Sequence, residues 1–96
     1  MKLKKIPPGT KLPVKFTQRE WNLICDKTNY NPDSTKLAVV EGKEVRADLS
    51  LGDIEEIQGY VAFEANHTKN LKLQKELDRL FAKLQVFLDS YDDQDE

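Results

Sequence analysis

The sequence predicts an α+β fold, with a small two- or three-stranded sheet covered on one face by three helices. Two segments indicate this fold, because each changes from an apolar period of two to a helical period at a hydroxyl residue. The third observation is a long apolar stripe near the end of the chain, spaced alternately by four and three residues. The 96 residues are enough for one domain with one modest core.

The first segment predicts a strand over 12–16 followed by a helix over 17–28. The strand has apolar residues at alternate positions, which are Leu12, Val14 and Phe16. Thr17 can cap the helix by accepting a hydrogen bond from the backbone N–H of Glu20, and the Glu20 carboxylate can return the bond. Trp21 is interpreted as a core anchor, with a contact to a partner protein as the alternative.

The second segment predicts a strand over 43–49 followed by a helix over 51–67. Apolar residues alternate along the strand, at Val45, Ala47 and Leu49. Ser50 is the expected helix cap. Asp53 has a shorter side chain than glutamate, so we expect it mainly to complement the dipole of the helix.

The stretch between the two segments contains two turns. The triplets at 31–33 (NPD) and 41–43 (EGK) have the composition of turns. Residues 33–40 are open to two interpretations, a short strand that pairs across the second turn or a helical turn. The β-branched side chains of Val39 and Val40 favour the strand.

The last predicted helix runs from Asn70 to Tyr91 and contains no Gly or Pro. Its apolar stripe consists of Leu73, Leu77, Leu80, Leu84, Phe87 and Tyr91, widened by Phe81 and Leu88. The opposite side is charged and carries Lys72, Lys75, Glu76, Asp78, Arg79 and Lys83. The short connection at 67–70 predicts that this helix forms an antiparallel helical hairpin with the helix before it.

Charge is distributed unevenly, although the net charge is only −2. We expect residues 1–11 to be a flexible basic arm, 12–91 the single domain, and 92–96 an acidic disordered tail. The tail could neutralise the arm of the same molecule or of a neighbour. No apolar run approaches the roughly 18 residues that span a bilayer, and there is one cysteine, so we expect a cytoplasmic protein without membrane contact.

The helix predicted over 51–67 has apolar residues on two sides, which is the main indication of function. One side is the expected core face and consists of Ile54, Ile57, Val61 and Ala65. Tyr60, Phe63 and His67 form a second stripe, which a small domain has few elements to cover. We therefore expect an interaction module that self-associates as a homodimer through this stripe or a sheet edge. Alternatively, the final helix covers the stripe and His67 caps a helix end.

The residues that could carry chemistry do not predict a catalytic or metal site. Glu64 and His67 are three residues apart, as in carboxylate-bridged metal sites, but such sites need two of these pairs and further carboxylates. Cys25 has only His67 as a candidate base for its activation. We therefore expect no enzyme activity and no cofactor, with a metal site at Glu64 and His67 as a remote alternative.

Nucleic-acid binding is the alternative function. The first 16 residues carry no acidic residue and five lysines, which are Lys2, Lys4, Lys5, Lys11 and Lys15. Such an arm can contact phosphates even when the domain has no net positive charge. However, the arm lacks arginine, and the chain contains no helix-turn-helix or RNA-binding strand motif.

Overall fold

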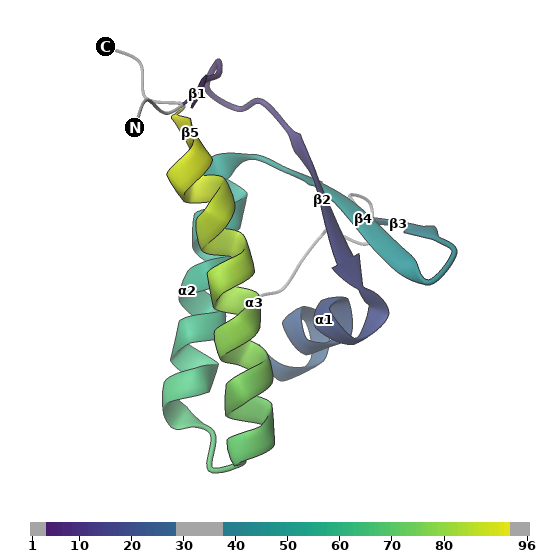
Figure 1. Ribbon diagram of the computed structural model, residues 1–96, viewed down its shortest axis with the longest axis vertical. Helices are drawn as coiled ribbons and strands as arrows, with labels where there is room; N and C mark the ends of the chain where they lie inside the picture. Colours follow the sequence, from purple (N-terminus) through teal and green to yellow (C-terminus); the bar gives the residue numbers. More distant parts are fainter. Residues whose placement is uncertain (1–3, 29–37, 93–96) are drawn as a thin grey trace.

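The computed structural model describes residues 4–28 and 38–92 and has the predicted α+β architecture (Figure 1). In chain order its elements are β1 (Lys4–Lys5), β2 (Leu12–Thr17), α1 (Gln18–Asn22), the π-helical turn η1 (Leu23–Lys27), β3 (Ala38–Glu41), β4 (Glu44–Leu49), α2 (Leu51–His67), α3 (Leu71–Ser90) and β5 (Tyr91–Asp92). The turn predicted at 31–33 lies outside the described residues. Within the described ranges, no helix is long and apolar enough to cross a membrane.

The main sheet is antiparallel and has the strand order β2-β4-β3. β2 pairs with β4 along its whole length, with Leu12 opposite Leu49. Inward-pointing residues of both strands are buried and the residues between them are more exposed, as the period of two predicts. β3 shows that the described part of residues 33–40 is a strand. It joins β4 through a turn at Gly42, whose φ of 64° is a conformation that glycine adopts without strain.

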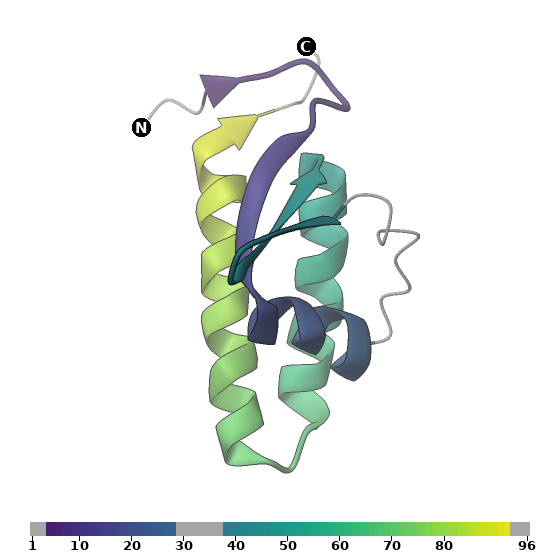
Figure 2. The same ribbon diagram turned by 90° about the vertical axis from the view of Figure 1, so that its right-hand side faces the viewer.

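The helices cover one face of this sheet (Figures 1 and 2). α2 and α3 lie antiparallel to each other, which confirms the predicted hairpin, while α1 and η1 follow β2 at one end of the core. The core consists of Leu12, Val14, Phe16, Leu23, Ile24, Ala47, Leu49, Leu51, Ile54, Ile57, Val61, Ala65, Leu77, Leu80 and Leu84. Phe81, predicted to widen the stripe of the last helix, is 36% exposed.

Both helices that follow a strand begin with a reciprocal cap. Thr17 Oγ1 accepts from Glu20 N at 3.0 Å, and Glu20 Oε1 accepts from Thr17 N at 2.8 Å. Ser50 Oγ accepts from Asp53 N at 3.1 Å, and Asp53 Oδ2 accepts from Ser50 N at 3.1 Å. The expectation for Asp53 is therefore incomplete. The extended backbone of Ser50 brings its N–H within reach of the shorter side chain.

β1 and β5 form a separate parallel pair, with Lys4 opposite Tyr91 and Lys5 opposite Asp92. Ile6 N donates to Asp92 O at 2.9 Å and continues the pairing. Part of the basic arm therefore lies beside the first residue of the acidic tail in the same chain (Figure 2). Strands of two residues leave no periodic pattern in a sequence, so periodicity does not predict this pairing.

Candidate functional site

The main candidate is a set of exposed residues on the side of α2 that points away from the core. We call this set the outward face of α2, and it consists of Glu55, Glu56, Gly59, Phe63 and His67. The Phe63 side chain is 50% exposed, and its ring stacks on the His67 ring with the centroids 4.1 Å apart. His67 Nδ1 lies 2.8 Å from Phe63 O, which holds the imidazole against the helix. The face therefore carries a fixed aromatic projection.

A shallow hollow of about 320 Å³ lies beside this projection. It is lined by Glu55, Glu56, Gly59, Tyr60 and Phe63. A Cβ atom at Gly59 would meet no heavy atom of the described part of the chain within 4 Å. Glycine inside a helix costs about 1 kcal/mol relative to alanine, and packing among the described residues gives no reason for that cost. A glycine inside a helical pattern often indicates a packing or functional requirement at that position. The predicted stripe of Tyr60, Phe63 and His67 does not include Gly59.

The structure separates the three residues of the predicted stripe. Phe63 and His67 are exposed, whereas Tyr60 is half-buried at the margin of the hollow. α3 leaves Phe63 exposed because it packs on another side of α2, where Gln58 Nε2 donates to Phe81 O at 3.3 Å. The alternative in which the final helix covers the whole stripe is therefore wrong for Phe63.

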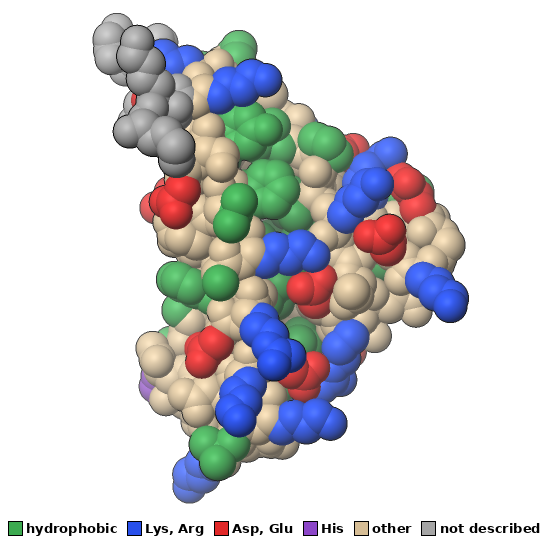
Figure 3. All heavy atoms as spheres, viewed as in Figure 1, with side chains coloured by type: hydrophobic (Ala, Val, Ile, Leu, Met, Phe, Trp, Pro, Cys, Tyr) green, Lys and Arg blue, Asp and Glu red, His purple; other side chains and the backbone are tan. Residues whose placement is uncertain are grey.

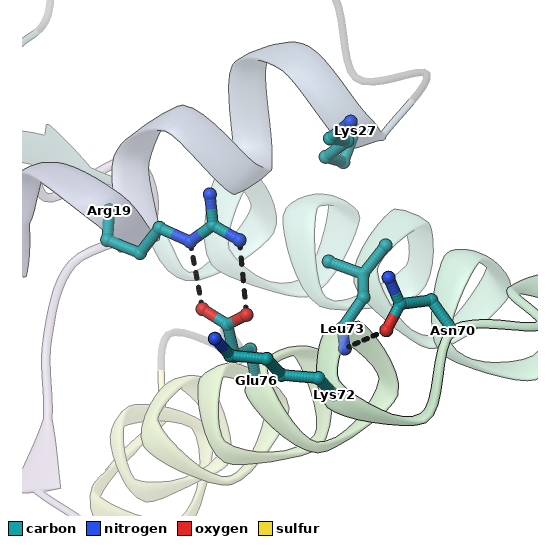
Figure 4. Close-up of a pocket in the computed structure, with 6 residues that line it drawn as sticks. All are labelled: Arg19, Lys27, Asn70, Lys72, Leu73 and Glu76. Carbon is teal, nitrogen blue, oxygen red and sulfur yellow. Dashed lines mark hydrogen bonds and ion pairs between the residues drawn. The ribbon is translucent and has the colours of Figure 1, made fainter.

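A second candidate is a basic surface where α1 and η1 meet the first half of α3 (Figure 3). It surrounds a hollow of about 220 Å³ lined by Arg19, Lys27, Asn70, Lys72, Leu73 and Glu76 (Figure 4). Arg19 Nε and Nη2 donate to the two carboxylate oxygens of Glu76 at 2.9 and 3.1 Å. These hydrogen bonds hold the pKa of Glu76 below its usual value, and the charges of Lys72 and Arg79 act in the same direction.

The basic surface continues along α3. Lys72, Lys75 and Arg79 are three and four residues apart, so they lie on one side of the helix, and all three are exposed. Arg19 neutralises Glu76, the acidic residue nearest to them in the hollow. An excess of positive charge therefore remains on this surface, as the grouping of Lys and Arg side chains in Figure 3 shows.

The four described lysines of the predicted arm do not line this hollow. Lys2 lies outside the described residues, and two others form β1. Lys15 is exposed on β2, and Lys11 Nζ lies 2.9 Å from Asp53 Oδ2. The charge of Lys11 is therefore paired at the start of α2, and the basic surface is built from other residues.

The candidates for catalysis and metal binding are not assembled into a larger site. In the part of the chain that the structure describes, no group of three or more His, Cys, Asp and Glu side chains could hold a metal ion, so Glu64 and His67 remain a pair. Cys25 is half-buried, and burial together with the charge of Asp26 raises the pKa of its thiol. A raised pKa disfavours the thiolate, which is the reactive form.

A third surface is the outer edge of β3. β3 is the last strand of the sheet and, among the described strands, pairs with β4 alone. Val39 and Val40 are 47% and 65% exposed, and a strand edge with apolar side chains can pair with a strand of another molecule. Trp21, the other residue considered for a partner contact, is half-buried against the core, with its ring centroid 5.6 Å from that of Phe16.

Comparisons of the chain with protein-family models, with curated proteins and with solved structures find no match. The choice among the three surfaces therefore depends on their geometry and chemistry. The outward face of α2 differs from the other two because it combines an exposed aromatic ring with an adjacent hollow. These features are typical of a surface that binds a protein.

Proposed function

We propose that this chain is a non-catalytic interaction module that self-associates through the outward face of α2. The observation that carries the proposal is the ring of Phe63, which is 50% exposed on a regular helix of 17 residues. Fully burying a phenylalanine side chain contributes about 1.5–3 kcal/mol. Removing this ring from water therefore favours association.

The surroundings of the ring support the same proposal. Phe63 and Gly59 form an apolar centre, and Glu55, Glu56 and His67 form a polar rim. Protein interfaces have this arrangement, and aromatic residues at their centres carry much of the binding energy. The apolar area on one copy is small, so we expect the association to be weak.

The test is the molar mass in solution, measured by light scattering over a range of protein concentrations. We expect a wild-type dimer at high concentration and a Phe63→Asp monomer, because the variant places a charge in the contact. Val86→Asp is the matched control, since Val86 is an apolar residue of α3 that is 62% exposed. This control should dimerise like the wild type. Both variants should keep the circular dichroism spectrum of the wild type.

Two outcomes would contradict the proposal. A wild type that stays monomeric at about 1 mM would exclude self-association, because even a weak dimer forms at that concentration. Val40→Lys distinguishes α2 from the sheet edge. If this variant abolishes the dimer and Phe63→Asp does not, the contact is made by the outer edge of β3.

Binding to a nucleic-acid backbone is a second candidate function. It is favoured by the basic surface, where Lys72, Lys75 and Arg79 of α3 are exposed. Lys72 also lines the same hollow as Lys27 of η1. Phosphate groups bind such surfaces with release of counterions, so the affinity falls as the salt concentration rises. The surface is on α1, η1 and α3, and so differs from the arm that the sequence predicts.

This second candidate is tested by the retention of a generic DNA duplex over a range of salt concentrations. The double variant Lys72→Glu, Arg79→Glu should weaken retention and reduce the slope of log K against log salt by roughly two. Lys43→Glu, in the turn between β3 and β4, is the control and should change neither. Wild-type retention that does not depend on salt, or that the double variant leaves unchanged, would rule out this surface.

A further inference from the structure

We infer that the outward face of α2 binds a second copy of the chain with the two α2 helices antiparallel about a two-fold axis. Phe63 of each copy then enters the hollow beside Gly59 of the other copy. The inference rests on the proposed function and adds the orientation of the partner and the register of the contact.

The projection and the hollow are one helical turn apart on the same face. Phe63 follows Gly59 by four residues, which is about 6 Å along the helix axis. If residue 63 of one copy is level with residue 59 of the other, the same contact is made twice and the two-fold axis passes level with Val61. One projection and one hollow are therefore enough for a self-complementary interface.

The side of the helix on which each residue lies agrees with this register. At 100° per residue, Phe63 projects from α2 at an angle between those of Gly59 and Glu56, and both of these residues line the hollow. The two-fold axis is perpendicular to the plane that contains the two helices. Residues on one flank of the first helix therefore meet the residues on the same flank of the second helix. The Phe63 ring is therefore directed into the hollow of the other copy.

The polar residues at the ends of the face are complementary in the same register. Glu56 of one copy and His67 of the other lie on the same side of the helix pair and within about 1.5 Å of the same level, and Glu55 and Asn66 are placed likewise. Phe63 O can only accept a hydrogen bond, so His67 Nδ1 is the donor of that contact. Nε2 can donate to a partner carboxylate when the ring carries a proton on both nitrogens. In a parallel pair, Glu55, Glu56 and Phe63 would each meet the same residue of the other chain. The acidic residues would then repel each other, and neither hollow would receive a Phe63 ring. The antiparallel arrangement also aligns the two helix dipoles favourably.

This arrangement explains a glycine at position 59, which contacts among the described residues of one chain do not. Helices pack about 8 Å apart only where the contact residues are small, and Gly59 lets the ring of the other copy approach the backbone. A contact made by one helix from each copy buries less than roughly 1,200 Å², which is typical of weak and transient interfaces. We therefore expect a dissociation constant of about 10–100 µM.

Gly59→Ala separates the effect on folding from the effect on association. A Cβ at this position meets no heavy atom of residues 4–28 and 38–92 within 4 Å, so the variant should fold and melt at or above the wild-type temperature. The methyl group narrows the hollow, and the dimer should weaken by about tenfold or more. Gly52→Ala is the matched control, because Gly52 is exposed at the start of α2 and its Cβ would meet only Ser50 Oγ, at 3.7 Å. This control should leave the dimer unchanged.

Disulfide cross-linking tests the orientation directly. Glu56→Cys and His67→Cys are made in separate chains that also carry Cys25→Ser, mixed, and oxidised. We expect a disulfide between the two different chains, because these positions lie on the same side of the helix pair at nearly the same level. The two copies of residue 56 would be about 15 Å apart along the axis, which a disulfide cannot span. A parallel pair would instead cross-link Glu56→Cys to itself.

The outcomes distinguish a failure of this inference from a failure of the proposed function. If Phe63→Asp abolishes the dimer while Gly59→Ala dimerises like the wild type, self-association through α2 stands and the register is wrong. Cross-linking of Glu56→Cys to itself would overturn the antiparallel orientation alone. A wild type that is monomeric at all concentrations would contradict both the proposed self-association and the inferred antiparallel arrangement.

Discussion

At the scale of single residues, Asp53 links the start of α2 to the chain that leads into β2. Its carboxylate accepts from Ser50 N at 3.1 Å and pairs with Lys11 Nζ at 2.9 Å. Burial raises the pKa of Asp53, but the hydrogen bonds from Lys11 and Ser50 and the charge of Lys11 outweigh burial. The pKa is therefore below its ordinary value of 3.8, which means that the folded state favours the ionised carboxylate.

The pKa of Asp53 determines how its contribution depends on pH. A carboxylate with a lowered pKa in the folded state stabilises the fold above its unfolded pKa, and this stabilisation is lost as the pH falls through the folded pKa. Asp53→Asn keeps an acceptor oxygen and removes the charge. We expect it to cost about 0.5–1 kcal/mol at pH 7, and the cost should shrink as the pH falls below 3.8.

Urea unfolding of the wild type and Asp53→Asn, measured from pH 7 down to about pH 2, checks this expectation. Asp78→Asn is the control, because Asp78 is exposed in the middle of α3, away from a helix end. A difference between Asp53→Asn and the wild type that stays constant over the whole pH range would contradict the role of the charge.

The caps show which residue roles a sequence can predict. The bonds between Thr17 and Glu20 are local, so the spacing of the two residues is enough to predict them. The role inferred for Gly59 depends on the space around a missing side chain, which only the packed structure shows. Tyr60 is a similar case, because its partial burial depends on its surroundings in the fold rather than on the period of α2.

At the scale of elements, α3 was the most predictable because its apolar period continues without a break for twenty residues. Leu77, Leu80 and Leu84 are buried, as the stripe predicts. The helix predicted over 17–28 is instead divided into α1 and the π-helical turn η1. Over such a short segment, an α-helical and a π-helical period place apolar residues almost alike, so the pattern does not separate them.

We expect the buried residues of α3, rather than its exposed ones, to stabilise the folded state. Leu84 is 0% exposed, and Leu84→Ala is expected to cost about 2–5 kcal/mol because it leaves a cavity in the core. Val86→Ala, two residues away at an exposed position, should stay within about 0.5 kcal/mol of the wild type. Chemical denaturation of both variants measures the difference. Equal losses would mean that α3 does not pack through the predicted stripe.

The register inferred for two α2 helices also bears on the metal alternative. A dimeric metal site would need both Glu64 and His67 pairs close together. In the antiparallel register the two copies of His67 are about 18 Å apart along the helix axis. Such a pair of helices therefore cannot complete the site, and zinc should not change the melting temperature of the dimer.

At the scale of the whole molecule, the fold class follows from patterns that are local in the sequence. The two strand-to-helix segments and the final stripe define the sheet, the helices and most of the core. The basic surface and the β1–β5 pair depend on residues that are far apart in the sequence. Arg19 and Glu76, for example, are 57 residues apart. No period or motif connects such positions, so these features become visible only in the structure.

The parallel pairing of β1 with β5 brings residues 4 and 92 to one pole of the molecule, beside the beginning of α2 and opposite the α2–α3 connection (Figure 1). Two copies joined through antiparallel α2 helices would point these poles in opposite directions. Whatever is tethered at either end of one copy would then be held away from whatever is tethered to the other.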